Sequence, residues 1–307
     1  MALKGYFEGF EHHGIEVEEG IVINTFVGGS GDEAILLLHG HPETYLIWRD
    51  IAPTLAKHYR VVATDLRGYG DSSKPKGLED HSNYSKRVMA RDQVRVMETL
   101  GIKKFHVVGH DRGGRVAHRL ILDYPEKALT CTFMDILPTY DMYEQTNREF
   151  ATKYWHWFFY IQKYPFPEQA LSADPAFFIR FNLLNKVGPE AAQRFPEEVL
   201  NEYIRCYAEP ACVHGICEDY RASASIDLAH DEVDRTHTIK TPLLALWGAN
   251  GVVGKLWNVL EGWKQYGEDV QGFGVLNCGH FVPEEKPEIC LETMMKFFDE
   301  KRTKERR

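Results

Sequence analysis

The stretch that decides the fold is Val107-Val108-Gly109-His110-Asp111-Arg112-Gly113-Gly114, between a short apolar run and a helical pattern. It has the form small-x-Asp-x-small, which is the sequence pattern of a nucleophile elbow. The turn is tight, so we expect a side chain at Gly109 or Gly113 to collide with the backbone. The central side chain then projects above the edge of a sheet, at a helix N-terminus that favours an anion.

The segments around the elbow alternate between strand and helix patterns. Strands are predicted at residues 21–27, 34–38, 60–64, 105–108, 243–247 and 272–276, with a further strand leading to Asp135. Helices are predicted at residues 48–57, 252–266 and 287–301, and apolar residues from 90 to 100 recur at helical spacing. This alternation predicts an α/β fold, with a mostly parallel sheet flanked by helices on both faces.

The strand pattern stops after Asp135. From about residue 136 to residue 230 the chain has helical and aromatic segments, cut into short pieces by several prolines. We therefore expect one α/β core interrupted by a helical cap. The predicted division is a first part of the core at 1–136, the cap at 137–230 and the second part of the core at 231–307.

Composition restricts the class of protein. The chain has 307 residues, 44% of them hydrophobic, and a formal net charge of -9, which argues against a nucleic-acid partner. We see neither the apolar run of a signal peptide nor a membrane span, and six scattered cysteines fit a reducing compartment, so a cytoplasmic protein is expected. Cys212, His214 and Cys217 match no common zinc spacing, so no metal is expected.

An aspartate at the centre of the elbow indicates attack on saturated carbon. A carboxylate that attacks an ester carbonyl would give an anhydride, whereas attack on saturated carbon gives an ordinary ester that water can cleave. Asp111 is therefore interpreted as the nucleophile that opens a carbon–halogen or epoxide bond. The alternative is an aspartate that only caps the following helix.

Two further residues complete a catalytic set. Asn277-Cys278-Gly279-His280-Phe281 follows the last predicted strand, and His280 is expected to take a proton from the water that attacks the Asp111 ester. The loop at 246–251 has no carboxylate, so Asp135 is assigned to orient His280, by position and by elimination. Asp135 could instead serve only the loop backbone at a strand end.

A backbone oxyanion hole is predicted beside the elbow. His39-Gly40-His41-Pro42 follows the strand at 34–38, and the turn can offer the backbone N–H of His41. The elbow itself offers the backbone N–H of Arg112. Together these two groups would stabilise the tetrahedral intermediate of ester hydrolysis.

Arg112 and Arg115 supply the positive charge that an anionic substrate needs in an acidic protein. Their spacing puts both guanidinium groups on one helix face near Asp111. They could hold a substrate carboxylate through paired N–H···O bonds and present the adjacent carbon for in-line attack. Plain stabilisation of Asp111, or an ordinary salt bridge for either arginine, is the alternative.

The motifs GHDRGGR (109–115), GHF (279–281), HGHPET (39–44), DLRGYGDS (65–72) and Tyr154-Trp155-His156-Trp157 resemble fluoroacetate dehalogenases of the α/β-hydrolase superfamily. The likeness spans nearly the whole chain, although the HGxP and RGYGDS elements are shared with epoxide hydrolases and haloalkane dehalogenases. The resemblance implies an α/β-hydrolase fold, substrate-carboxylate binding by Arg112 and Arg115, a homodimer and no cofactor. It also implies that His156, Trp157 and Tyr220 bind the leaving halide.

The implied halide site is chemically reasonable. Fluoride is small and strongly hydrated, and an imidazole N–H, an indole N–H and a phenol O–H offer it three hydrogen-bond donors. His156 and Trp157 could instead belong to the aromatic packing of residues 154–160, and Tyr203 and Tyr207 compete with Tyr220 for the third position. His41 departs from the family, where an apolar or aromatic residue is usual, and its side chain could change the preference among haloacids.

Two other functions remain open. An epoxide hydrolase would share Asp111, Asp135 and His280, but a cation at Arg112 is badly placed for a neutral epoxide. A non-catalytic receptor of the same fold need not keep a complete nucleophile, acid and base. The prediction is therefore a dehalogenase of small haloacids, with epoxide hydrolysis as the alternative.

Overall fold

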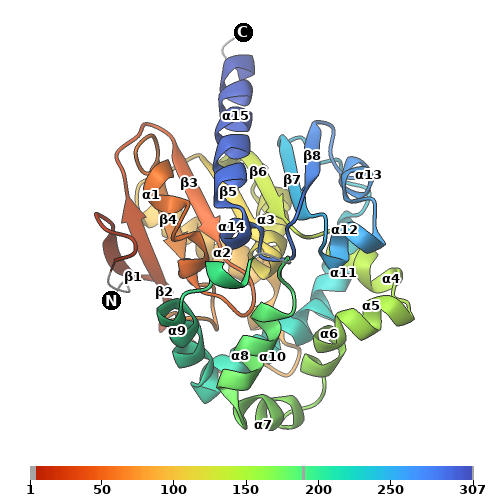
Figure 1. Cartoon of the computed structure of the whole chain (residues 1–307). Coiled ribbons are helices and arrows are strands. Elements are labelled where there is room, and N and C mark those ends of the chain that lie inside the picture. The colour runs from red at the N-terminus through yellow and green to blue at the C-terminus, as the bar shows by residue number, and fades with distance from the viewer. Residues whose placement is uncertain (1–4, 189–190, 306–307) are drawn as a thin grey trace.

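A central β-sheet positions the elbow. In the computed structural model, which describes residues 5–188 and 191–305, the strands form one eight-stranded sheet in the order β1-β2-β4-β3-β5-β6-β7-β8 (Figure 1). Their bounds are β1 Glu11–Glu18, β2 Ile21–Gly28, β3 Ala34–Leu38, β4 Arg60–Thr64, β5 Phe105–His110, β6 Ala128–Met134, β7 Leu243–Gly248 and β8 Val270–Val275. β1 and β2 pair antiparallel, and β2 also pairs antiparallel with β4, whereas every pair from β4 to β8 is parallel. The predicted α/β fold with a mostly parallel sheet is confirmed.

Helices cover both faces of this sheet. α2 (Lys86–Thr99) and α3 (Asp111–Asp123) lie behind it in Figure 1, and α15 (Pro287–Glu305) crosses in front with α14 (Val282–Glu285) and α1 (Ala52–Leu55). α12 (Val252–Leu256) and α13 (Val259–Lys264) lie at the β7–β8 side, and three short 3-10 helices complete the core: η1 (Tyr45–Trp48), η2 (Ser82–Tyr84) and η3 (Pro125–Lys127). Every residue of β3 and β5 is buried, as expected for strands covered on both faces.

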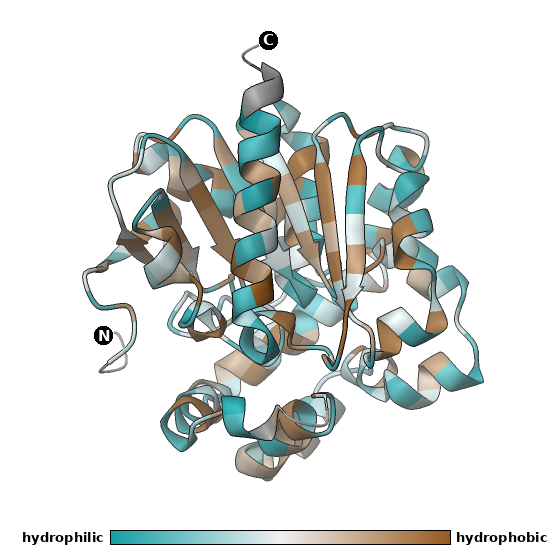
Figure 2. Ribbon diagram, turned by 45° about the horizontal axis from the view of Figure 1, so that its top comes forward, coloured by the Kyte–Doolittle hydropathy of each residue, from teal (hydrophilic) through white to brown (hydrophobic). Residues whose placement is uncertain are grey.

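A helical insertion separates β6 from β7. Within the described residues it contains α4 (Thr139–Glu144), α5 (Arg148–Lys153), α6 (Trp155–Tyr160), α7 (Phe166–Ser172), α8 (Pro175–Leu184), η4 (Ala192–Arg194), α9 (Glu197–Tyr207), α10 (Pro210–Ser223) and α11 (Ile226–Asp234). Figure 1 shows these helices below the sheet, at the edge where the parallel strands end. Figure 2 shows that hydrophobic residues are concentrated on the strands and on parts of the helices.

Three local predictions were wrong or incomplete. The helix expected at 48–57 is replaced by η1 and the single turn α1, because Pro53 has no N–H and is accommodated only at the start of a helix. The helix expected at 252–266 divides into α12 and α13, because Trp257 is extended and the side chain of Asn258 caps the second helix. β1 was not predicted, since this edge strand is largely exposed and buries mainly Ile15 and Val17.

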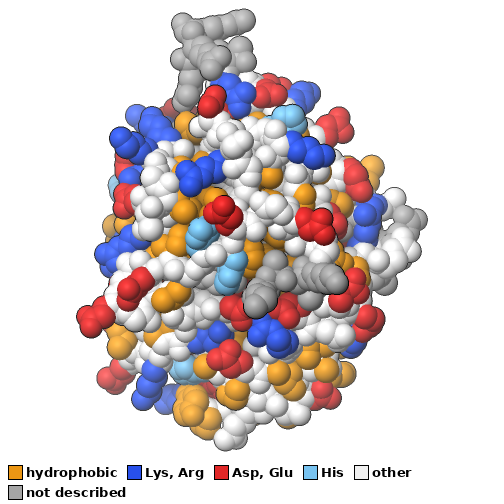
Figure 3. All heavy atoms as spheres, turned by 90° about the vertical axis from the view of Figure 1, so that its left-hand side faces the viewer, with side chains coloured by type: hydrophobic (Ala, Val, Ile, Leu, Met, Phe, Trp, Pro, Cys, Tyr) orange, Lys and Arg blue, Asp and Glu red, His pale blue; other side chains and the backbone are white. Residues whose placement is uncertain are grey.

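The described surface is mixed in charge. Figure 3 shows acidic and basic side chains interspersed on one face of the molecule. No helix within residues 5–188 and 191–305 is both long and apolar enough to cross a bilayer.

Candidate active site

The elbow has the strained geometry that its glycines indicated. Asp111 begins α3 directly after β5 with φ +46°, a left-handed conformation that is uncommon for a residue with a side chain. A Cβ at Gly109 would lie 2.4 Å from the carbonyl oxygen of Gly113, and a Cβ at Gly113 would lie 2.4 Å from that of Leu38. The expected collision of side chains with the backbone at both glycines is therefore confirmed. The turn holds Asp111 at the edge of the sheet.

The structure brings the three predicted catalytic residues together. Nδ1 of His280 lies 2.5 Å from Oδ2 of Asp135, and Nε2 of His280 lies 3.7 Å from Oδ2 of Asp111. Asp135 immediately follows β6 with φ +52°, and its Oδ1 accepts the backbone N–H of Gly248 at 3.1 Å. Asp135 therefore contacts the loop backbone with one oxygen and His280 with the other.

One backbone donor of the predicted oxyanion hole is aimed at the nucleophile. The N–H of His41 donates to Oδ1 of Asp111 at 3.0 Å. Gly40 permits this approach, because a Cβ there would lie 2.6 Å from the Cβ of Asp111. Burial lowers the pKa of the His41 side chain to about 3, so the ring is neutral, and its Nε2 lies 3.3 Å from the hydroxyl of Tyr160. Arg112 stands next to Asp111 at the start of α3, and its N–H remains the second proposed donor.

Surrounding positive charge keeps Asp111 ionised. Burial would raise the pKa of this carboxyl, but His280, His110, Arg112 and Arg115 together hold the pKa well below its usual range. An ionised carboxylate is the form that can act as a nucleophile.

A second imidazole–carboxylate pair lies behind the elbow and was not predicted. Nε2 of His110 lies 2.9 Å from the carbonyl oxygen of His280, and Nδ1 lies 3.6 Å from Oε2 of Glu43. Burial would lower the pKa of His110, but the nearby charge of Glu43 outweighs burial and raises the pKa to about 9. A cationic His110 can then donate to the loop that carries His280 and fix its position.

Arg112 is fully buried and is held by a residue that sequence reasoning missed. Its Nε donates to Oδ2 of Asp219 at 2.8 Å, and its Nη2 donates to Oδ1 at 2.9 Å. The guanidinium carbon also lies 4.1 Å from the ring centre of Tyr220. Among the described residues Nη1 has no hydrogen-bond partner, so this group is left to bind a ligand.

Arg115 is arranged in a similar way. Its Nη1 donates to the carbonyl oxygen of Leu137 at 3.0 Å and to the hydroxyl of Thr139 at 2.9 Å, while its guanidinium lies 4.6 Å from the ring centre of Trp157. Its Nε is buried and has no partner in the described part of the chain. Each arginine thus keeps one buried nitrogen that has no hydrogen-bond partner among the described residues.

The three expected halide-binding residues surround the arginines. The rings of His156 and Tyr220 lie 6.0 Å apart, with Tyr220 against Arg112 and Trp157 against Arg115. Nδ1 of His156 and Nε1 of Trp157 are buried and have no hydrogen-bond partner among the described residues. Burial lowers the pKa of His156 well below its ordinary value, so the ring is neutral and keeps one N–H to donate.

The two tyrosines that were alternatives to Tyr220 at the halide site occupy other positions. The hydroxyl of Tyr203 donates to Oε1 of Glu284 at 3.0 Å, and Tyr207 packs beside His41 with ring centres 6.0 Å apart. Tyr154 was given no catalytic role in the sequence analysis, yet its ring lies 6.5 Å from that of His280. Burial raises the pKa of Tyr154 well above its ordinary value, and the charge of Asp111 acts in the same direction.

The cysteines of α10 form no metal-binding arrangement. His214 contacts Glu168, with Nδ1 to Oε1 at 3.3 Å, and its Nε2 accepts the backbone N–H of Gly77 at 3.2 Å. Within the described residues no group of three or more His, Cys, Asp or Glu side chains is placed to hold a metal ion. All six cysteines are free thiols, including Cys212 and Cys217.

The chain is similar to known proteins over most of its length. A family profile described as the alpha/beta hydrolase fold matches residues 33–287. A fluoroacetate dehalogenase of Burkholderia sp. is 42% identical over 97% of this chain and 96% of its own length, and a soluble epoxide hydrolase of Corynebacterium sp. (strain C12) is 31% identical over 94% and 96%. A crystal structure of a Salmonella enterica protein, provisionally described as an acyltransferase, superposes with a TM-score of 0.94 at 46% identity and covers 97% of this chain and 98% of that one.

Proposed function

Because the chain belongs to the α/β-hydrolase fold family, we propose that it is a hydrolytic dehalogenase that converts fluoroacetate and other small 2-haloacids to glycolate-type products and halide. One observation carries the proposal: an ionised carboxylate at Asp111 faces two buried arginines that each keep an unpartnered N–H in the described structure. A haloacid has a carboxylate for the arginines and a carbon–halogen bond for the nucleophile. Acyl transfer fits less well, because an aspartate that attacked an acyl carbonyl would form an anhydride.

The first proposed step is displacement of the halide. Oδ1 of Asp111 is held by the N–H of His41, which leaves Oδ2 to attack the carbon next to the substrate carboxylate. A carbon–oxygen bond forms, the carbon–fluorine bond breaks, and fluoride departs with its electron pair. Arg112 and Arg115 hold the carboxylate, and the N–H groups of His156 and Trp157 replace water around the leaving ion, with Tyr220 as the third donor.

The second proposed step is hydrolysis of the Asp111 ester. Nε2 of His280 takes a proton from water, which attacks the carbonyl carbon of the ester, and Asp135 stabilises the resulting imidazolium. The oxyanion is stabilised by the backbone N–H groups of His41 and Arg112. Collapse of the intermediate returns the proton from His280 to the departing alkoxide and leaves Asp111 as a carboxylic acid, which releases its proton to regenerate the carboxylate. The sum is haloacid plus water giving hydroxy acid, halide and a proton.

The helical insertion acts as a cap in this proposal. It contributes His156 and Trp157 from α6 and Tyr220 from α10, so the halide site is complete only when the insertion lies over the sheet edge. The division expected from the sequence, with the cap at residues 137–230, is kept as part of the proposal.

Epoxide hydrolysis is a second candidate, because a relative carries that name and two buried tyrosines, Tyr154 and Tyr220, are electrostatic neighbours of Asp111. Their hydroxyls could protonate an epoxide oxygen. The deciding experiment incubates the purified protein with fluoroacetate at a fluoride electrode and, in parallel, with styrene oxide. We expect continuous fluoride release and no diol, whereas diol without fluoride would overturn the dehalogenase proposal.

A further inference from the structure

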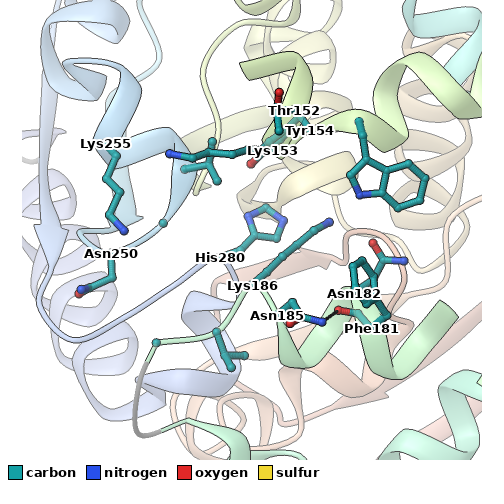
Figure 4. Close-up of a pocket in the computed structure, with 15 residues that line it drawn as sticks. Thr152, Lys153, Tyr154, Phe181, Asn182, Asn185, Lys186, Asn250, Lys255 and His280 are labelled. Carbon is teal, nitrogen blue, oxygen red and sulfur yellow. Dashed lines mark hydrogen bonds between the residues drawn. The ribbon is translucent and has the colours of Figure 1, made fainter. Parts of the chain in front are cut away.

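A cavity of about 690 Å³ lies outside the catalytic centre and reaches it at His280. Figure 4 shows its walls, which come from the ends of α5 and α8, the start of α6 and the loop that leads into α12. We call this cavity the outer chamber. Its lining residues are 152–155, 181, 182, 185–188, 250–252, 255 and 280.

The charged side chains of the outer chamber all have the same sign. Lys153, Lys186 and Lys255 line it, and no aspartate or glutamate is found among its described lining residues. This is unusual in a chain with 45 acidic and 36 basic residues. Lys153 is neutralised in part by Glu149, with Nζ to Oε1 at 2.6 Å. In the described part of the chain neither Lys186 nor Lys255 forms an ion pair, so no carboxylate in direct contact neutralises their charges.

Lys186 links the chamber to the catalytic centre. Its carbonyl oxygen accepts the backbone N–H of His280 at 2.9 Å, and Figure 4 shows its amino group between His280 and Asn182. The side chain is only partly exposed. The carboxylates of Asp111 and Asp135 are close enough to stabilise the charge of Lys186. The charge of Lys186 in turn lowers the pKa of the His41 and His156 imidazoles.

We propose that the outer chamber is a binding site for small carboxylate anions, which holds the haloacid at Lys186 and Lys255 before it passes His280 and reaches Asp111. The assignment of the anion to substrate rests on the proposed function. A protein with a net charge of -9 repels an anionic substrate on average, and a cleft lined by positive charge offsets that repulsion by raising the local concentration of the anion. The same lysines give the outgoing hydroxy acid and halide a path through favourable potential.

The direct test measures anion binding without turnover. Lysines of the whole protein are reductively methylated with carbon-13, which keeps their charge, and the signals are assigned with Lys186→Arg and Lys255→Arg. On titration with acetate we expect saturable shifts at Lys186 and Lys255, and none at the exposed Lys57. The shifts should persist in Arg112→Lys, where the inner carboxylate site is weakened. Absence of saturation, or loss of the shifts with Arg112→Lys, would overturn the proposal.

A kinetic arm tests whether the chamber serves catalysis. We expect Lys186→Gln to lower kcat/KM for fluoroacetate by about threefold to tenfold at low salt with kcat within about twofold, and to reduce the dependence on ionic strength. Lys186→Arg should restore the wild-type value, and Lys57→Gln is the matched control. An unchanged kcat/KM in Lys186→Gln would reject the chamber as a route for substrate. If the wild-type protein releases no halide from any haloacid, the proposed function fails, while the acetate titration still decides whether the chamber binds anions.

Discussion

Asp219 fixes the guanidinium of Arg112 through two parallel hydrogen bonds, Nε to Oδ2 at 2.8 Å and Nη2 to Oδ1 at 2.9 Å, in a fully buried pair. Asp219 is itself held by the hydroxyl of Tyr69 at 2.6 Å and by Lys86. The carboxylate therefore determines which N–H of Arg112 remains free. In the proposed reaction that group binds the substrate carboxylate, so Asp219 acts as a positioning residue for substrate binding.

We expect Asp219→Asn to raise KM for fluoroacetate by about tenfold or more, with a smaller change in kcat, because an asparagine cannot accept both hydrogen bonds from Arg112. Steady-state kinetics with fluoride detection would measure both constants. Thermal unfolding should also show that the free energy of unfolding falls by about 3–5 kcal/mol, because the buried charge of Arg112 loses its partner.

Asp227→Asn is the matched control for this variant. Asp227 accepts the backbone N–H of Lys86 at 2.8 Å and its carboxylate lies 3.5 Å from the Lys86 ammonium, but it makes no direct contact with Arg112 among the described interactions. The Asp227→Asn variant should lose stability but keep KM for fluoroacetate within about twofold of the wild-type value. Equal increases of KM in both variants would show that general loss of structure, rather than the position of Arg112, explains the effect.

The two proposed chemical steps can be separated at His280. In His280→Gln the nucleophile Asp111 is intact, but no base activates water for the ester. We expect one equivalent of fluoride to be released per protein, followed by a steady-state rate at least about 1,000-fold below wild type. Mass spectrometry of the digested protein should find a carboxymethyl ester on the peptide that contains Asp111.

Asp111→Asn is the control for that experiment and should release no fluoride and carry no adduct. A single turnover of the wild-type protein in heavy-oxygen water should place the label in the carboxylate of Asp111, because water attacks the ester carbonyl. Label found only in the glycolate would mean that water attacks the substrate directly, and the ester intermediate would be rejected.

The elbow and the residues at the ends of the strands could be predicted because their chemistry is local. Gly109, Asp111 and Gly113 encode a turn that few other residues permit, and parallel strands bring the following residues to one edge of the sheet. That is why Asp135 and His280 meet at 2.5 Å although 145 positions separate them in the chain. The fold class followed from the same alternation of strand and helix.

The supporting residues could not be predicted because their roles depend on packing between distant segments. Asp219 lies on α10 and meets Arg112 only when the helical insertion closes over α3, and its sequence context Cys217-Glu218-Asp219-Tyr220 resembles an ordinary polar helix face. Lys186 lies in the loop after α8, in a segment with no motif. The N-cap Asn258, in contrast, was a readable signal that divides the helix expected at 252–266.

Trp157 provides a test of the leaving-group site. Its Nε1 is buried without a partner among the described residues, and its ring also covers Arg115. Trp157→Phe retains an aromatic ring for packing and removes the N–H. We expect kcat for fluoroacetate to fall by about tenfold to a hundredfold, the value of a hydrogen bond to a charged group. The value of kcat for chloroacetate should fall much less, because chloride is a better leaving group and needs fewer hydrogen-bond donors. Equal losses for both substrates would assign Trp157 to packing instead.

Lys186 makes substrate capture depend on pH. Burial lowers its pKa from 10.5 to about 8, although the charges of Asp111, Glu43 and Asp135 partly oppose this shift. The anion-binding form is the protonated one, so capture is complete only well below pH 8 and is lost as pH rises through that value. We expect KM for fluoroacetate to rise severalfold between about pH 7 and pH 9. In Lys186→Arg, which stays charged, this rise should disappear, whereas Lys186→Gln should show the high KM at every pH. A rise that survives in Lys186→Arg would assign the titration to another group and remove Lys186 from substrate capture.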